Sequence, residues 1–208
     1  MANFPSSLIK TLYYNKKLGV PEISKKTGIG EWTIYKWMGK IGLPRRTLSE
    51  RNKLIFERKP KSFFLKQNLS REEEKLKLAG IMLYWTEGAK LNQAKRSVIV
   101  DFANSNPQMI KLFLKFLRDI CGVDERRLRV LLYCYANQNI DRLKKFWQNI
   151  TNIPPSQFTK PYVRKDFLLE KKDKMKYGLV HVRYCDKKLL IQIEDWVRDY
   201  LKRNNIYG

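Results

Sequence analysis

The sequence predicts an α+β protein, in which a small all-helical unit precedes a larger mixed domain where strands alternate with helices. Before residue 48, apolar residues recur every three to four positions in short segments separated by glycines. After residue 71, helical periods alternate with short apolar runs that polar residues or prolines bound. We therefore expect a helical domain at 1–48, a basic linker at 49–71 and a mixed domain at 72–208.

The composition describes a folded and strongly basic protein. Of the 208 residues, 43% are hydrophobic, and 43 Lys and Arg residues against 20 Asp and Glu residues leave a net charge of +23. Such a field attracts polyanions, and nucleic acid is the first candidate. We expect no membrane contact and an intracellular location, in the cytoplasm or nucleoid, because the sequence has neither a long apolar run nor an opening signal segment. The three cysteines form no CxxC pair, which favours buried thiols over a zinc site.

Three helices are expected in the first domain. Apolar side chains within 8–13 share one face, Pro21 suits the first turn of a second helix that Gly28 ends, and a third helix follows Gly30. Three short helices with a glycine-bearing turn before the last are typical of a helix-turn-helix, and 21–38 resembles that motif in bacterial and phage DNA-binding proteins. The competing interpretation is a three-helix cap that packs on the larger domain.

In a helix-turn-helix, the first turn of the third helix faces the edges of the DNA bases. The candidates for base contact are Glu31, Trp32, Thr33, Tyr35 and Lys36. Arg45 and Arg46 follow this helix, and we expect them to hold phosphate or to enter the minor groove.

The segment 49–71 mixes charged residues with isolated aromatics and shows no sustained period, so it is predicted to be a linker. Its cations Arg58, Lys59 and Lys61 are candidates for contact with the DNA backbone between the two domains. Its apolar residues 63–65 are expected to dock on one domain, which would limit the movement of the two modules.

A long helix is predicted to open the mixed domain, because Ser70 and Glu73 form a capping-box pair before an apolar run. The residues that share its apolar stripe are Leu76, Gly80, Leu83 and Glu87. A carboxylate at the C-terminal end of a helix opposes the helix dipole, so a cation should lie nearby. A divalent metal would serve, and the alternative is an ordinary ion pair of Glu87 with Lys90 or Arg96.

Residues 78–88 read LAGIMLYWTEG, which resembles the signature helix of the LAGLIDADG homing endonucleases, and the similarity extends through most of 72–205. The resemblance implies that Glu87 binds Mg²⁺ beside the scissile phosphate, with the Thr86 carbonyl next to it. The sequence departs from the family pattern at Met82, where a small residue is usual. Because one motif is present, the resemblance implies a homodimer through the 76–88 helix, bound to near-palindromic double-stranded DNA.

Four strands and three further helices are expected after the motif helix. The strands are predicted at 97–103, 128–135, 158–163 and 179–185, and the helices at 106–120, 139–150 and 187–204. In the last two strands polar residues, Arg164 and Arg183 among them, alternate with apolar ones, so one face is expected to meet a DNA groove. The resemblance makes Gln157, Lys160 and Lys165 the candidates to organise the attacking water, with an ordinary phosphate contact as the alternative for each.

Other nuclease chemistries are restricted by the residues present. His181 is the only histidine, which excludes HNH and His-Cys box sites, whereas Asp166 with Asp186 and Lys188 loosely fits the acid, acid-x-Lys pattern of restriction-type nucleases. The leading hypothesis is a sequence-specific, Mg²⁺-dependent endonuclease for double-stranded DNA. The alternatives are a transcription regulator that has this fold but does not cleave, and an RNA-binding intron maturase.

Overall fold

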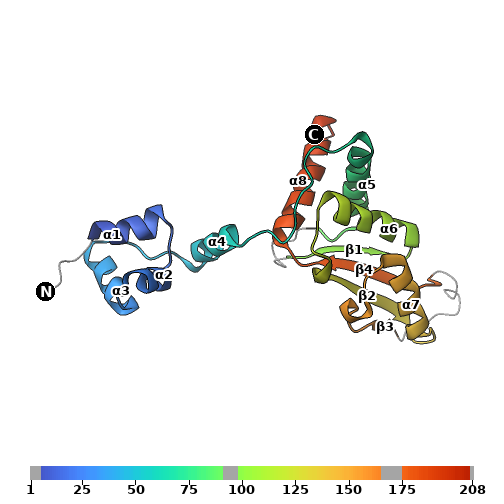
Figure 1. Cartoon of the computed structure of the whole chain (residues 1–208), viewed down its shortest axis with the longest axis horizontal. Coiled ribbons are helices and arrows are strands. Elements are labelled where there is room, and N and C mark those ends of the chain that lie inside the picture. Colours follow the sequence, from blue (N-terminus) through green and yellow to red (C-terminus); the bar gives the residue numbers. More distant parts are fainter. Residues whose placement is uncertain (1–5, 91–97, 165–174, 207–208) are drawn as a thin grey trace. The chain divides into compact units, whose positions relative to one another are not determined.

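The computed structural model describes residues 6–90, 98–164 and 175–206, and the chain divides into two compact units, Met1–Pro60 and Lys61–Gly208. The described part of the first unit is all-helical, and the second holds a four-stranded sheet with helices (Figure 1). The α+β class predicted from the sequence is therefore confirmed. Within the described ranges, no helix is both long enough and apolar enough to cross a membrane.

The first unit consists of short helices around a small core. They are α1 (Ser6–Lys10), which continues as the wider turn η1 (Thr11–Asn15), α2 (Val20–Thr27), α3 (Glu31–Lys40) and α4 (Leu48–Arg58). Gly28 ends α2 at φ 73°, a left-handed conformation that glycine adopts without strain. The buried core residues are Ile9, Leu12, Tyr13, Val20, Ile23, Ile34, Met38 and Leu43.

The segment 49–71 differs from the irregular linker that the sequence predicts, because most of its first part is the helix α4. Thr47 caps this helix: its Oγ1 accepts from the backbone N of Glu50 at 3.2 Å, and the Glu50 carboxylate accepts from the backbone N of Thr47 at 2.7 Å. No residue of α4 is buried, and a helix without a buried face leaves no apolar period in the sequence.

The residues that follow α4 pack on the second unit. Phe63 is buried and pairs with Val123, and the backbone N of Phe64 donates to the carbonyl of Gly122 at 3.0 Å. The expected docking of 63–65 therefore takes place through the Phe63 side chain, with Leu65 half-buried, while the side chain of Phe64 is 82% exposed.

The second unit is built on a mixed sheet with the strand order β1-β4-β2-β3 (Figure 1). Its strands are β1 (Val100–Asn104), β2 (Leu128–Tyr135), β3 (Tyr162–Arg164) and β4 (Leu179–Tyr184). β4 pairs antiparallel with both β1 and β2, and β3 runs parallel to β2. The third strand is shorter than the predicted 158–163, because Pro161 has no N–H for a ladder bond and Phe158 makes only an isolated bridge to Val130.

Helices cover one face of this sheet. They are α5 (Arg71–Glu87), α6 (Pro107–Lys115) with its continuation η2 (Phe116–Ile120), the short turns η3 (Glu125–Arg127) and η4 (Pro155–Gln157), α7 (Ile140–Thr151) and α8 (Lys187–Arg203). Alternate strand residues join the helices in a single core. The other face, which we call the polar face, is formed by Asp101, Ala103, Arg129, Leu131, Tyr133, Tyr162, Arg164, His181 and Arg183.

Two glycines allow α5 to approach its neighbours closely. A Cβ on Gly80 would stand 2.1 Å from Cγ of Phe116, so the absence of a side chain lets α5 contact η2. A Cβ on Gly88 would stand 2.4 Å from the ring of Tyr84, and Gly88 instead pairs with Phe102 of β1. The chain therefore passes directly from the end of α5 to the edge of the sheet.

Candidate nucleic-acid interface

The helix α3, which the sequence predicts to contact bases, presents a mixture of aromatic and cationic side chains. Trp32 is 73% exposed, and the Lys36 ammonium lies 5.1 Å from the centre of its ring. The Arg45 guanidinium lies 4.3 Å from the ring centre of Tyr35. Of the predicted base readers, Glu31, Trp32 and Lys36 are exposed, whereas Thr33 and Tyr35 are half-buried. The first turn of α3 therefore offers donors, an acceptor and a flat apolar surface to a partner.

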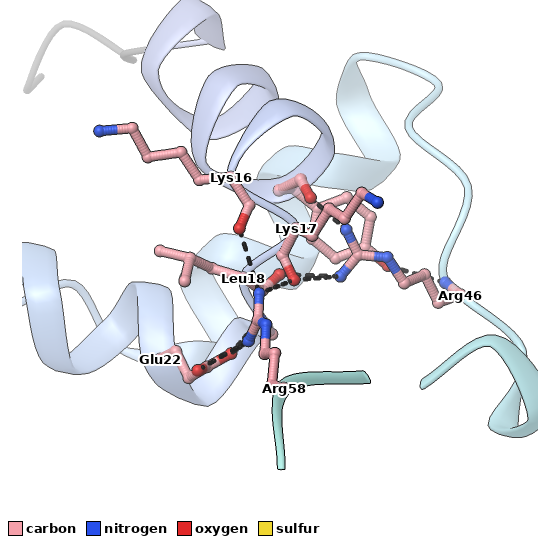
Figure 2. Close-up of polar contacts among 8 residues, drawn as sticks. Lys16, Lys17, Leu18, Glu22, Arg46 and Arg58 are labelled. Atoms are coloured by element: carbon pink, nitrogen blue, oxygen red, sulfur yellow. Dashed lines mark hydrogen bonds and ion pairs between the residues drawn. The ribbon is translucent and has the colours of Figure 1, made fainter. Parts of the chain in front are cut away.

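Arg46 and Arg58 are engaged with the chain itself (Figure 2). The guanidinium of Arg46 donates to the carbonyls of Leu18 at 2.9 Å and of Tyr13, and it lies 4.0 Å from the centre of the Tyr13 ring. The guanidinium of Arg58 donates to the carbonyl of Lys17 at 2.5 Å. Both cations thus hold the loop 16–18, where carbonyl groups at the end of η1 lack helical partners. We call this group of contacts the arginine clamp.

The clamp also includes a carboxylate. Arg58 forms a two-oxygen contact with Glu22 at 3.0 and 2.9 Å, and Glu22 accepts from the backbone N of Gly19 at 2.6 Å. The hydrogen bond from Gly19, together with Arg58 and against the opposing effect of burial, lowers the pKa of Glu22. These contacts give Arg46 and Arg58 a structural role, and we leave both out of the interface proposed below.

The other two linker cations are exposed. Lys61 lies 5.6 Å above the ring of Phe63, and Lys59 follows the last residue of α4. Their contact with the DNA backbone remains a prediction.

Glu87 is exposed at the last position of α5 and makes no hydrogen bond or ion pair with any residue that the structure describes. The ammonium of Lys90 instead donates to the carbonyls of Tyr84, at 3.2 Å, and of Trp85. The cation expected at the C-terminal end of the helix is therefore Lys90, and it binds carbonyl groups and not the carboxylate. Burial lowers the pKa of Lys90, with Glu194 acting in the opposite direction. Arg96, the other partner considered, lies outside the described residues.

The carboxylate of Glu87 would need further ligands to hold Mg²⁺. Thr86 offers its carbonyl, while its hydroxyl donates to the carbonyls of Leu83 at 3.0 Å and Met82 at 3.2 Å. Within the described ranges, no three His, Cys, Asp or Glu side chains lie together as a metal site. Mg²⁺ is usually held by one or two carboxylates with water and phosphate, so Glu87 and the Thr86 carbonyl would hold the ion together with the substrate, and a second copy of the chain would add another carboxylate.

The polar face carries a hydrogen-bonded cluster that crosses two strands. Asp101 of β1 bonds to Nδ1 of His181 at 2.7 Å and accepts from Nε of Arg183 at 2.8 Å, both on β4. The ring of Tyr133 on β2 lies 4.7 Å from that of His181 and 4.8 Å from that of Tyr162 on β3. A row of mutually tilted rings therefore crosses three strands, with the cluster at one end.

The two described residues among those that the sequence assigns to catalysis beside Glu87, Gln157 and Lys160, make no hydrogen bond or ion pair with Glu87. Gln157 donates to the carbonyls of Glu125 and Leu128, both at 2.7 Å, and so closes the turn before β2. Lys160 is exposed beside β3, and Lys165 lies outside the described residues. Arg164 is exposed at the end of β3, with its guanidinium 5.9 Å from the ring of Tyr135.

The restriction-type alternative is not supported where it falls on described residues. Asp186 caps the N-terminus of α8, accepting from the backbone N of Lys188 at 2.8 Å and from Oγ of Ser62 at 2.6 Å. Burial raises the pKa of Asp186, but the hydrogen bonds from Ser62 and the helix N-terminus outweigh it and lower the pKa. This carboxylate is thus occupied as a helix cap, and its proposed partner Asp166 lies outside the described residues.

Sequence reasoning missed Asp101 and Tyr133. The signal for Asp101 was a single acid between two apolar residues of a predicted strand, which places it on the face opposite the core. Its pairing with His181 depends on strand register, which the sequence did not supply. In comparisons with known proteins, no family model, no curated protein and no solved structure matches this chain.

Proposed function

We propose that the protein is a sequence-specific, Mg²⁺-dependent endonuclease for double-stranded DNA that acts as a homodimer. The observation that carries the proposal is the position of Glu87, an exposed carboxylate at the end of α5 with no partner among the described residues, where Gly88 joins the edge of the sheet. A carboxylate next to a cationic, hydrogen-bonding surface suits metal-assisted cleavage of a phosphodiester. The helix α3 and Arg45 of the first unit would add affinity and lengthen the site.

The polar face supports a duplex partner. Its cations Arg129 and Arg164 are exposed, and Arg183 is 31% exposed. The rings of Tyr133 and Tyr162 are inclined by 36° at 4.8 Å, so each covers part of the face of the other. Because each ring covers part of the other, the ring edges and hydroxyl groups remain available for hydrogen bonds to base edges in a duplex groove. Binding of single-stranded bases would instead require free ring faces for stacking.

The homodimer is supported by apolar side chains on the outer side of α5. Leu78 is 39% exposed and Trp85 is 42% exposed, and with the half-buried Met82 they follow the spacing of one helical stripe. Beside Leu78, a groove of about 410 Å³ runs between α5 and α8. Two copies that meet through this stripe would pack their α5 helices against each other.

Glu87→Gln provides the direct test. We would digest a randomised duplex library with and without Mg²⁺, using the wild type, Glu87→Gln and the control Glu72→Gln, which removes an exposed carboxylate from the first turn of the same helix outside the groove. Cuts at a defined site that require both Mg²⁺ and Glu87, and that persist in Glu72→Gln, would establish the endonuclease.

A non-cleaving transcription regulator is the second candidate, and Lys90 is the observation that favours it. Because this ammonium already binds the carbonyls at the end of α5, the helix needs no metal ion to offset its dipole. Tight and sequence-selective binding without any cutting would identify the regulator. Preference for folded RNA over duplex DNA in competition would instead support the maturase.

A further inference from the structure

The cluster of Asp101, His181 and Arg183 contains none of the residues that the sequence assigned to catalysis. Both oxygens of Asp101 are occupied: Oδ1 lies 2.7 Å from Nδ1 of His181, and Oδ2 lies 2.8 Å from Nε of Arg183. The side chains of Asp101 and His181 are each 18% exposed. The cluster is therefore held firmly by its neighbours while part of it still reaches solvent.

These contacts determine which nitrogen of His181 can react. A carboxylate accepts hydrogen bonds, so Nδ1 is the nitrogen that carries the proton, and Nε2 of the neutral ring holds a lone pair. Arg183 fixes the second oxygen of Asp101, and the ring of Tyr133 lies 4.7 Å from the imidazole. The imidazole is thus restrained in tautomer and in orientation, as the base of a carboxylate–histidine pair must be.

The strand ladder places this pair beside the end of α5. Gly88 pairs antiparallel with Phe102, and the backbone N of Ala89 donates to the carbonyl of Asp101 at 2.8 Å. Ala103, the residue after Phe102, pairs with His181, so the chain that leaves α5 at Gly88 meets the same strand that pairs with the imidazole-bearing strand.

We infer that His181 is the general base of the phosphodiester hydrolysis proposed above, with Asp101 as its positioning residue; the inference rests on that proposed function. Nε2 takes a proton from a water molecule, the water oxygen forms a bond to phosphorus, and the bond from phosphorus to the deoxyribose oxygen breaks. The departing oxygen takes a proton from solvent, and His181 releases its proton to solvent. Water is the only reactant consumed besides the DNA.

His181→Asn removes the basic nitrogen while keeping the hydrogen bond that His181 makes in the fold. The asparagine amide places a donor near the position of Nδ1, so the bond to Asp101 can form, but the side chain has no basic nitrogen. We expect single-turnover cleavage of the identified site to fall by about 100-fold or more, with DNA affinity and thermal stability close to those of the wild type. Added imidazole should restore part of the rate to His181→Ala and none to Glu87→Gln.

A substrate with sulfur in place of the departing oxygen separates base from acid catalysis. A thiolate leaves without a proton, so a variant that lacks a general acid regains its rate on this substrate, and a variant that lacks a general base does not. We expect His181→Asn to remain slower than the wild type on both substrates. Recovery on the sulfur substrate would make His181 the acid and would overturn the inference.

The tautomer is accessible by ¹⁵N NMR, because the chain has one histidine and the spectrum holds one pair of imidazole nitrogens. We expect the proton on Nδ1 in the wild type and a shift towards Nε2 in Asp101→Asn, a readout that simple loss of packing would not give. A wild-type proton on Nε2 would overturn the inference whatever the cleavage result. One combination of results would support the endonuclease and refute the role of His181: the wild type cuts, Glu87→Gln does not cut, and His181→Asn cuts as fast as the wild type. If the wild type cuts no duplex, the proposed function fails and the role of His181 fails with it.

Discussion

Arg45 and Arg46 are adjacent and carry the same charge, yet the structure gives them opposite roles. Arg46 belongs to the arginine clamp, where its guanidinium bonds to the Leu18 and Tyr13 carbonyls and lies against the Tyr13 ring. Arg45 is exposed and lies over Tyr35. Arg46→Ala should therefore destabilise the first unit, and Arg45→Ala should weaken DNA binding without affecting stability.

The size of the effect follows from the contacts that are lost. Hydrogen bonds to a charged group contribute about 1.5 to 3 kcal/mol, and the ring contact about 0.5 to 1 kcal/mol. Because the clamp is partly exposed, water can replace some of these bonds, and the contributions do not add. We expect a net loss of about 2 kcal/mol for Arg46→Ala, which corresponds to about a 30-fold rise in the opening equilibrium of the unit.

Hydrogen exchange in the full-length chain measures this opening. The backbone amides of Ile34 and Met38 lie in the buried part of α3 and report on the first unit alone. Their exchange should be about 30-fold faster in Arg46→Ala and within about 2-fold of the wild type in Arg45→Ala. Arg46→Lys keeps the charge but lacks the planar fork, and it should lie between these values. Unchanged exchange in Arg46→Ala, or an equal rise in Arg45→Ala, would refute the structural role of the clamp.

Three further predictions follow from packing, protonation and exposure. Gly80→Ala should lower the free energy of unfolding in urea by about 1 to 3 kcal/mol, because the new methyl group would meet Phe116. In the control Gly39→Ala the new methyl group meets nothing within 4 Å, so the free energy of unfolding should rise slightly. Equal effects of the two substitutions would contradict the close approach of α5. Folding lowers the pKa of Asp186, so the stabilising contribution of this carboxylate is present above the pKa of the unfolded chain and is lost as the pH falls below about 4. The variant Asp186→Asn should therefore be less stable than the wild type at pH 7 and should lose less stability on acidification. Parallel stability-versus-pH profiles of the two proteins would count against the cap. In the native chain Cys185 should react with a thiol reagent while the two buried cysteines, for which burial raises the pKa, do not; rapid modification of all three thiols before unfolding would show that the core opens.

The sequence was sufficient for the elements with strong local signals. β2 lies at the predicted residues, and Gly28 ends α2 where the turn was expected. α4 was missed because none of its residues is buried, although its capping pair Thr47 and Glu50 was visible in the sequence. Local composition thus identifies a helix mainly through its buried face, and an exposed helix has to be found from its cap.

The site was harder to predict, because the partners of its polar side chains are distant in the chain. Asp101 and His181 are 80 residues apart, and only the register of β1 with β4 brings them together. From the sequence alone, Arg46 and Arg58 are predicted to be free cations in a basic segment. The backbone carbonyls at 16–18 that they bind cannot be identified from residue types. Glu87 could be singled out because its position on the helix is fixed by the helical period alone.

The arginine clamp determines where the first unit can be cut and transplanted. A graft that ended at residue 48 would keep the three helices but would discard Arg58 and leave Glu22 without its ion pair. A graft that ended at Pro60 would carry both guanidinium groups together with the carbonyls that they hold. A chimaera that fuses the first unit to another protein should therefore include α4, and recombination between related genes would preserve the unit only at crossovers beyond it.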